Sequence, residues 1–330
     1  MDKMTTIHTQ APLAVPVPIE DLRTAFAEFL RLDVAQGDAS PETIRTYLGQ
    51  VTAYLTWCQA EGIHPAVATE EDLKQYRAAL ISAGYARATM ATKLAAVRRF
   101  YAMARARGYR PDNPAEGVKA PLDRTDRAER VKWLPLQAVR DLLEAPDPAT
   151  AKGKRDRAIL TLMAIHGLRV VEVARLQVGD LDPEARGQGT LTVKGKGDKI
   201  RTVILVDESA AALEEWLAVR SHVAAEGDVA FFVSLQRNGG RGTAMSRRGI
   251  REAVDGYLEA LGLKRAGVSC HSLRHSFATL SRAAGARLDA LARAMGHASV
   301  TTTQVYADIV DAAAENPARF LVGALAAAEG

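Results

Sequence analysis

Residues 295–306, MGHASVTTTQVY, hold the most informative pattern of this chain. Gly296 is expected to end a helix, because glycine is favoured just beyond a helix C-terminus. Ser299 can cap the helix that follows, and about two further turns bring Tyr306 round. The stretch therefore predicts that an imidazole, His297, and a phenol stand at the ends of two successive helices. Taken alone, Tyr306 is better explained as a packing aromatic.

A second polar stretch, residues 269–279 with the sequence SCHSLRHSFAT, precedes it. His271 and Arg274 are three residues apart, so on a helix they share a face. Arginine offers a planar fork of donors that suits two phosphate oxygens. His271 and His275 have the i, i+4 spacing of some zinc sites, but the glutamate of an HExxH motif is missing. We therefore expect no metal and no other cofactor.

Two further cationic positions lie upstream. Arg169 opens a helical run in HGLRVVEV, where the helix dipole would favour an acid; either a bound anion or an ion pair with Glu172 explains it. Lys196 stands between two glycines in KGKGDK, at the tip of an expected hairpin. A lysine there can protonate a leaving oxygen, although a polar turn is the simpler interpretation. No GxxxxGK[ST] loop occurs, so nothing supports ATP use.

The composition sets the class of protein. The chain has 330 residues, of which 48% are hydrophobic and 25% charged, and a net charge of +4. A chain of this length favours about two domains, and a mild positive charge is compatible with a polyanionic partner. The two cysteines, Cys58 and Cys270, form no CxxC pair, which fits a reducing interior. Neither a signal peptide nor a long apolar run is present, so we expect a cytoplasmic protein without a membrane segment.

The pattern divides the chain into four parts. We expect a flexible arm over 1–18, a helical domain over 19–117, a linker over 118–133 and a mixed domain over 134–330. The linker prediction rests on the prolines and alternating charges of residues 111–133. The fold class is thus mostly α with a small antiparallel β-sheet (α+β).

Local signals place the elements of the first domain. Ser40-Pro41-Glu42 is a strong helix start, and a second helix runs from Thr69 to its end at Gly84. The third, from Arg87 to Arg107, combines an apolar face (Leu94, Val97, Tyr101) with basic residues and no acid. Either a solvated face or contacts with DNA phosphates account for it. The candidate DNA-binding residues are Arg87, Lys93, Arg98, Arg99 and Arg105, with Arg247 and Arg248 of the second domain.

In the second domain, patterns predict both element types. Helices are expected at 135–144, 155–166 and 169–177, and again from Ser246 onward. The strands expected at 190–194 and 199–206 form the hairpin around Lys196. Residues 231–233, FFV, are expected to add a short strand.

Read together, these positions resemble the tyrosine recombinases, the phage-integrase and Xer-like family. RDRAILTLMAIHGLRVVEVARL (155–176), VKGKGDKIRTV (193–203), SCHSLRHSFAT and MGHASVTTTQVY occur in the family's order. The intervals from His271 to Tyr306 are three, twenty-three and nine. More weakly, ETIRTYLGQVTAYLTW (42–57) is similar to the core-binding domain that precedes the family's catalytic domain. The resemblance covers nearly the whole chain after residue 18.

The resemblance implies a mechanism. Tyr306 attacks a DNA phosphodiester and leaves a 3′-phosphotyrosyl link with a free 5′-hydroxyl, so that religation needs neither ATP nor a metal. Arg169, Arg274 and His297 stabilise charge at the phosphorus, and Lys196 protonates the 5′-oxygen. His271 is the expected base or positions the phenol, and Glu172 orients its neighbours.

The implied partner is double-stranded DNA that carries a specific recombination site. The resemblance also implies a homotetramer bound to two such sites, and accessory proteins as possible further partners. The apolar segment Phe320–Ala327 would dock on a neighbouring subunit or on its own domain. We expect a cytoplasmic, nucleoid-associated protein that serves integration, excision or dimer resolution. Two alternatives stay open: a DNA-relaxing enzyme similar to type IB topoisomerases, and a non-catalytic DNA-binding regulator on the same fold.

Overall fold

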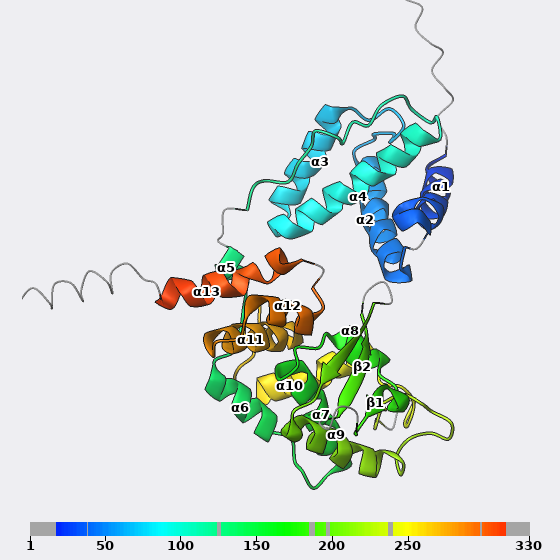
Figure 1. The fold of residues 1–330 in the computed structure, drawn as a ribbon. Helices are drawn as coiled ribbons and strands as arrows, with labels where there is room; N and C mark the ends of the chain where they lie inside the picture. Colours follow the sequence, from blue (N-terminus) through cyan, green and yellow to red (C-terminus); the bar gives the residue numbers. More distant parts are fainter. Residues whose placement is uncertain are drawn as a thin grey trace, which may run out of the picture. The chain divides into compact units, whose positions relative to one another are not determined.

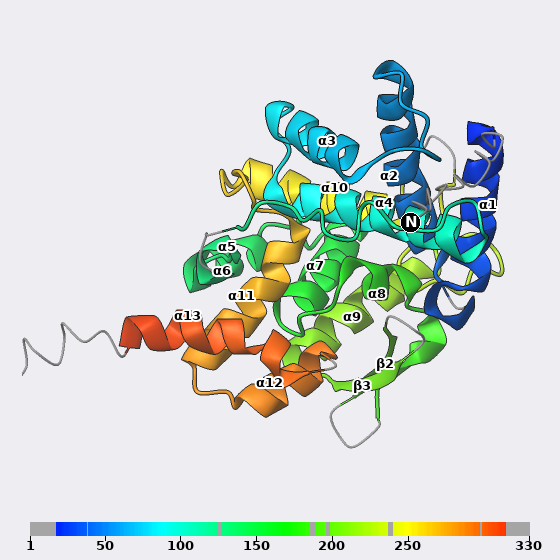
Figure 2. The same cartoon turned by 90° about the horizontal axis from the view of Figure 1, so that it is seen from above.

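The fold comes from a computed structural model, which describes residues 18–37, 39–123, 127–184, 189–195, 199–236, 240–297 and 299–314. The chain divides into two compact units, Met1–Arg124 and Thr125–Gly330 (Figures 1 and 2). The described elements are mostly helices, with one small antiparallel sheet. The predicted fold class is therefore confirmed. None of the described helices combines the length and the apolar composition that crossing a membrane requires.

The described part of the first unit is helical. Its elements are α1 (Ile19–Leu32), η1 (Val34–Gly37), α2 (Pro41–Ala60), α3 (Glu70–Ser82) and α4 (Arg87–Ala106). The start predicted for α2 is present, because the Ser40 hydroxyl accepts a hydrogen bond of 3.2 Å from the Thr43 amide. At the start of α3, Thr69 and Asp72 cap each other's backbone amides, an arrangement that satisfies two otherwise unpaired donors.

The core of the first unit is formed by helices α1 to α4 and by the segment after α4. The apolar face predicted for α4 is buried, with Leu94, Val97 and Tyr101 each at most 1% exposed. Tyr54 of α2 meets Tyr101 at an O–O distance of 2.5 Å. The Tyr101 hydroxyl also donates a hydrogen bond of 3.1 Å to the Pro65 carbonyl. These bonds satisfy polar groups that would otherwise be costly inside an apolar core.

The segment after α4 packs on the first unit instead of extending into solvent. Ala115 and Val118 are buried in its core. Arg98 of α4 donates to both of their carbonyls, at 3.2 and 3.1 Å. The stretch expected to form a linker thus begins as a packed segment, because an arginine of α4 satisfies its backbone oxygens.

The second unit contains the sheet and most of the described helices. Its elements are α5 (Arg127–Arg130), α6 (Leu136–Glu144), α7 (Ala151–Ala164), α8 (Val170–Arg175), η2 (Val178–Asp180), β1 (Leu181–Asp182), β2 (Thr190–Lys194), β3 (Ile200–Ile204), α9 (Asp207–Arg220), α10 (Arg247–Ala260), α11 (Cys270–Ala283), α12 (Leu288–Met295), η5 (Val300–Thr302) and α13 (Gln304–Ala314). The sheet order is β1-β2-β3, with both pairs antiparallel. The hairpin predicted from the sequence is present, with Leu191 opposite Val203.

The strand expected at residues 231–233 is not formed. Phe231 and Phe232 are buried in the core, but their backbone groups bond to separate partners. The Phe231 amide donates to Leu176 at 2.7 Å, and its carbonyl accepts from the Trp216 indole at 2.8 Å. The segment has only isolated β-bridges, one at Val233 itself and one at the preceding Ala230. The hydrophobic run predicted burial correctly, whereas its pairing depended on distant residues.

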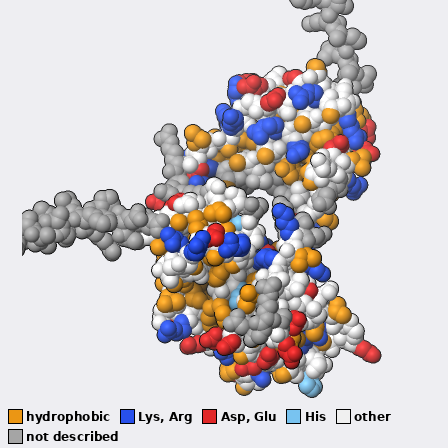
Figure 3. All heavy atoms as spheres, viewed as in Figure 1, with side chains coloured by type: hydrophobic (Ala, Val, Ile, Leu, Met, Phe, Trp, Pro, Cys, Tyr) orange, Lys and Arg blue, Asp and Glu red, His pale blue; other side chains and the backbone are white. Residues whose placement is uncertain are grey.

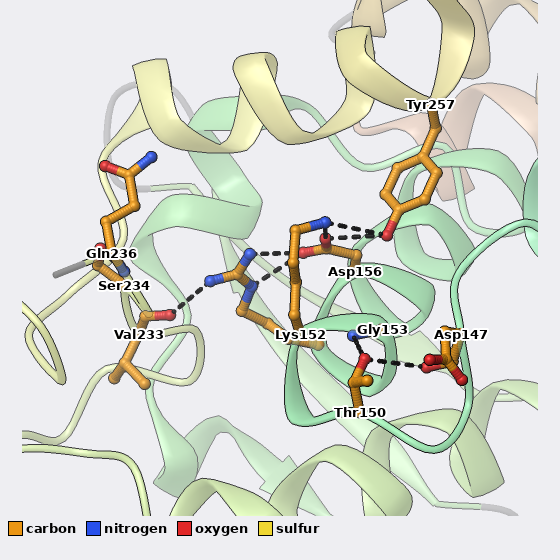
Figure 4. Close-up of polar contacts among 10 residues, drawn as sticks. Asp147, Thr150, Lys152, Gly153, Asp156, Val233, Ser234, Gln236 and Tyr257 are labelled. Carbon is orange, nitrogen blue, oxygen red and sulfur yellow. Dashed lines mark hydrogen bonds and ion pairs between the residues drawn. The ribbon is translucent and has the colours of Figure 1, made fainter. Parts of the chain in front are cut away.

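Helix α7 is the central helix of the second unit, and its residues Ala158–Ala164 are all buried. It also carries a buried carboxylate, Asp156, whose two oxygens are shared among three partners (Figure 4). Arg155 binds one oxygen at 2.7 and 2.9 Å, while Lys152 and Tyr257 of α10 reach the other at 2.9 and 3.1 Å. Arg155 also donates to the Val233 carbonyl at 3.2 Å. A charge this deep is tolerated because it is fully paired, and the network fixes α7 against α10.

Candidate active site

The site begins at the turn between α7 and α8. Gly167 has a φ of +64°, and a Cβ there would lie 2.4 Å from the Phe277 ring, so only glycine fits. Two residues on, Arg169 caps α8. Its amide donates to Glu172 at 2.8 Å, and its guanidinium reaches the same carboxylate at 3.0 Å. The ion pair considered from the sequence is thus present.

Glu172 is buried and also bound by an arginine that the sequence did not single out. Arg201 of β3 grips both carboxylate oxygens, each at 2.9 Å, and donates to the Ala294 carbonyl at 3.1 Å. Burial by itself raises the pKa of Glu172, but hydrogen bonds from Arg201 and from the Arg169 amide outweigh it, and the pKa is lowered. Glu172 is therefore ionised and joins α8, β3 and the end of α12. The only sequence signal for Arg201 was its place in the hairpin stretch.

The two guanidiniums predicted to converge do so on one carbonyl. Arg274 of α11 is 2% exposed and donates to the Met295 carbonyl at 2.6 Å and to Gly167. Arg169 reaches the same Met295 oxygen at 3.4 Å. Burial, and then the charge of Arg169, lowers the pKa of Arg274 to about 9, so it remains charged at neutral pH.

His297 lies next to this pair, after the predicted helix end. Gly296 adopts the left-handed conformation that closes α12. The His297 Nε2 is 3.0 Å from Arg274, and its Nδ1 is 2.8 Å from the Thr303 hydroxyl. Because a guanidinium can only donate, Nε2 accepts and Nδ1 carries the proton. Burial, and then Arg274, lowers the pKa of His297 to about 4.

Tyr306 of α13 is 4% exposed and lies against α11; both ribbon views place the two helices side by side (Figures 1 and 2). Its hydroxyl is 2.8 Å from Nδ1 of His275, the residue after Arg274. His271, the histidine expected to assist the phenol, lies at the exposed start of α11. Its ring meets that of His275 edge-on, with centroids 4.7 Å apart.

The structure therefore brings together six of the seven predicted catalytic and supporting residues, directly or through one neighbour. Lys196 lies outside the described residues; beside it, the Gly195 amide donates to Lys199 at 2.7 Å. Within the described ranges, no three His, Cys, Asp or Glu side chains are arranged to hold a metal ion.

Comparison with known proteins assigns this chain to a family. Residues 132–312 match the phage integrase family, and residues 25–108 match the N-terminal SAM-like domain of phage integrases. The chain belongs to the phage integrase family. As a member, it is an enzyme of the tyrosine recombinase type, and the resemblance drawn from the sequence is confirmed.

Curated relatives agree with this assignment. The chain is 34% identical over 298 residues to tyrosine recombinase XerC of Pelotomaculum thermopropionicum, covering 86% of this chain and 92% of the relative. It is also 34% identical to tyrosine recombinase XerD of Xanthomonas axonopodis pv. citri, covering 82% and 88%.

Solved structures share the fold. The XerH recombinase in a post-cleavage complex with a palindromic difH substrate matches with a TM-score of 0.73 at 20% identity, covering 93% of this chain and 97% of that one. A lambda integrase tetramer bound to a Holliday junction matches with a TM-score of 0.66 at 16% identity, covering 88% and 77%.

The candidate DNA-binding residues fall into two groups, those that contact their own unit and those that are exposed. Lys93 is buried over the Tyr85 ring, and Arg87 and Arg98 donate to backbone carbonyls of the packed segment. Arg99 and Arg105 are exposed on α4, and Lys and Arg side chains are spread over the face of this unit seen in Figure 3. At the start of α10, Arg247 and Arg248 are exposed, and Arg248 pairs with Glu252 at 2.6 Å.

Proposed function

We propose that this chain is a site-specific DNA recombinase in which Tyr306 attacks a DNA phosphodiester and forms a 3′-phosphotyrosyl intermediate. The observation that carries the proposal is the meeting of Arg169 and Arg274 on the Met295 carbonyl, with Tyr306 held by the residue after Arg274. Family membership supports the same reaction class.

The geometry supports charge stabilisation at the phosphorus. An attacking phenolate and a departing 5′-oxygen leave negative charge on the phosphoryl oxygens, and fixed donors stabilise it without reorganising. Arg274 is fixed by two carbonyls, and Arg169 by Glu172 and Met295. His297 would contact a phosphate oxygen after gaining a proton on Nε2, the nitrogen that accepts from Arg274 in the free protein. Lys196 is assigned the protonation of the leaving 5′-oxygen.

The partners follow from this reaction. Strand exchange joins two duplexes, so the chain works as a homotetramer on two copies of a specific site, in the cytoplasm on nucleoid DNA, with accessory proteins able to set its direction. Integration, excision and dimer resolution are all outcomes of this chemistry. The first unit contacts DNA through Arg99 and Arg105, which its own fold leaves exposed.

The test is covalent capture. Wild-type protein incubated with nicked duplexes of randomised core sequence should form an adduct that survives denaturation, with a 3′ phosphate attached to Tyr306. Tyr306→Phe should bind the selected duplex and form none, and an adduct in that variant rejects the nucleophile. Lys196→Ala should cleave slowly while still binding, whereas lost binding rejects its role as the acid.

A further inference from the structure

The Tyr306 hydroxyl is held by a histidine that the proposed reaction has not used. His275 Nδ1 lies 2.8 Å from the phenolic oxygen, within the distance over which a proton passes between hydrogen-bonded groups. The two rings are tilted by 47°, with centroids 5.8 Å apart. Both side chains come from regular helices, α11 and α13, which pack together. The contact therefore lies between two packed helices of the unit.

The surroundings of His275 keep its imidazole neutral at pH 7, with one ring nitrogen available as a hydrogen-bond acceptor. Burial lowers its pKa to about 4, with further lowering by His271, Arg274 and His297. Among the described residues, these three groups and the Tyr306 phenol are the titratable side chains that act on it. At neutral pH one ring nitrogen carries a proton and the other is a free acceptor. A phenol, with a pKa of about 10, is the natural donor to it.

His271 is placed for a different task. Its imidazole makes no hydrogen bond to any described residue, and its side chain is exposed. Its ring meets the His275 ring edge-on, and it is His275 whose nitrogen contacts the phenol. An exposed imidazole beside Arg274 is suited to contact a phosphate oxygen of bound DNA.

We propose that His275 is a further catalytic residue, which accepts the phenolic proton of Tyr306 through Nδ1 during strand cleavage. The inference rests on the proposed function. As the Tyr306 oxygen bonds to phosphorus, its proton passes to Nδ1, and the electron pair of the broken phosphorus–oxygen bond leaves on the 5′-oxygen. That oxygen takes its proton from the acid assigned to Lys196. In religation, protonated His275 returns the proton to the phenolate.

The first test measures single-turnover cleavage of the captured nicked duplex against pH. His275→Asn keeps a hydrogen-bonding group near the Nδ1 position but is not basic, and it should cleave about 10²-fold more slowly at pH 7, since a positioned base contributes roughly 10²–10⁴-fold. The rate should then rise about tenfold per pH unit, as the phenolate fraction does, while the wild-type rate stays flat near neutrality. Replacing Tyr306 by a fluorotyrosine of lower phenol pKa should restore the variant more than the wild type.

Controls separate this role from others. His222→Asn changes an exposed histidine outside the site and should match the wild type. A defect in His275→Asn that is equal at all pH values, or faster cleavage on loss of the histidine, overturns the proposal. So does the same pH signature in His271→Asn with none in His275→Asn. Wild-type protein without any adduct would reject the proposed function instead.

A second measurement needs no DNA. In the free protein, nitrogen-15 histidine spectra should show His275 protonated at Nε2, with Nδ1 accepting from the phenol. His275→Ala should lower the pKa of Tyr306 in an ultraviolet titration, because the hydrogen bond from the phenol to Nδ1 stabilises the protonated phenol. A His275 that carries its proton on Nδ1 and donates to the phenolic oxygen overturns the proposal, whatever the DNA experiments give.

Discussion

Replacing Arg201 by methionine should destabilise the second unit, because the buried Glu172 loses two of its hydrogen bonds. Arg201 donates twice to Glu172, at 2.9 Å each, and once to Ala294, at 3.1 Å. Its side chain is 15% exposed and that of Glu172 is 0% exposed, so water cannot replace the lost donors. Methionine retains the packing volume and removes the charge.

The size of the effect follows from the partners left behind. Hydrogen bonds to charged groups contribute about 1.5–3 kcal/mol each, and removing one partner of a buried ion pair costs about 3–5 kcal/mol. Glu172 keeps the amide and guanidinium of Arg169, which offsets part of this loss. We expect the free energy of unfolding to fall by about 3 kcal/mol. For a unit of this size, that lowers the melting temperature by about 6–12 °C.

The pH dependence gives the same prediction an independent check. The pKa of Glu172 is lowered in the folded protein, so its ionised form stabilises the fold above the unfolded pKa. That stabilisation is lost as the pH falls through the lower folded pKa. The difference between wild type and Arg201→Met should therefore be full at pH 7 and should shrink below about pH 4.

The assay is urea unfolding followed by tryptophan fluorescence in a Trp57→Phe background, where Trp133 and Trp216 report on the second unit. Arg287→Met is the matched control, because Arg287 pairs with Asp289 at the surface and is 83% exposed; its effect should stay below about 0.5 kcal/mol. An equal loss in both variants, or no loss in Arg201→Met at pH 7, would refute the reasoning.

Three other predictions follow. Arg98→Met should lower the free energy of unfolding of the first unit by about 2 kcal/mol, since two buried carbonyls lose their donor. Arg99→Met should leave that stability unchanged and reduce the salt slope of DNA binding by about 1. Calorimetry and binding isotherms that show the reverse contradict both predictions. Gly167→Ala should lower the free energy of unfolding by about 2–5 kcal/mol, because φ is +64° there and the new methyl group clashes with the Phe277 ring. Gly84→Ala, which has open space around it, should lower it by about 1–2 kcal/mol. Equal melting temperatures of the two variants would contradict this prediction. The chemical shift of the His297 ring should stay constant from pH 8 to 5 and change near pH 4, because burial lowers its pKa. The fold then loses stability as the pH falls from about 6.5 to about 4. A titration midpoint of His297 near pH 6.5 would exclude this.

Local chemistry explains how much of the fold could be predicted. Caps such as Ser40 and the glycine after α12 act over a few residues, so helix boundaries were readable from sequence. Whether Phe231 pairs in a sheet depends on where Leu176 and Trp216 lie. That information is spread over the chain, and the strand prediction failed there.

The same distinction applies to the site. Spacing placed Arg274 and Tyr306 near each other, but it could not tell which histidine meets the phenol. His271 and His275 lie on adjacent turns of α11, and the packing of α13 against α11 brings the phenol to His275. Arg201 was hidden for another reason: its partner Glu172 is twenty-nine residues away, and their contact depends on how β3 packs against α8.

The buried carboxylate of Glu172 balances only part of the positive charge of the arginine cluster formed by Arg169, Arg201 and Arg274. Arg169, Arg201 and Arg274 face a single acid, Glu172, and the repulsion that remains contributes to the lowered pKa of Arg274. The carbonyls of Met295 and Gly167 offset part of it with their dipoles. In the proposed reaction, a phosphodiester that enters the cluster supplies the missing negative charge, and it supplies more as the attacking phenol and the leaving oxygen share the phosphorus. The charge left unbalanced in the free protein is therefore best matched when the strand is half broken, which is the condition for accelerating the reaction instead of merely binding its substrate.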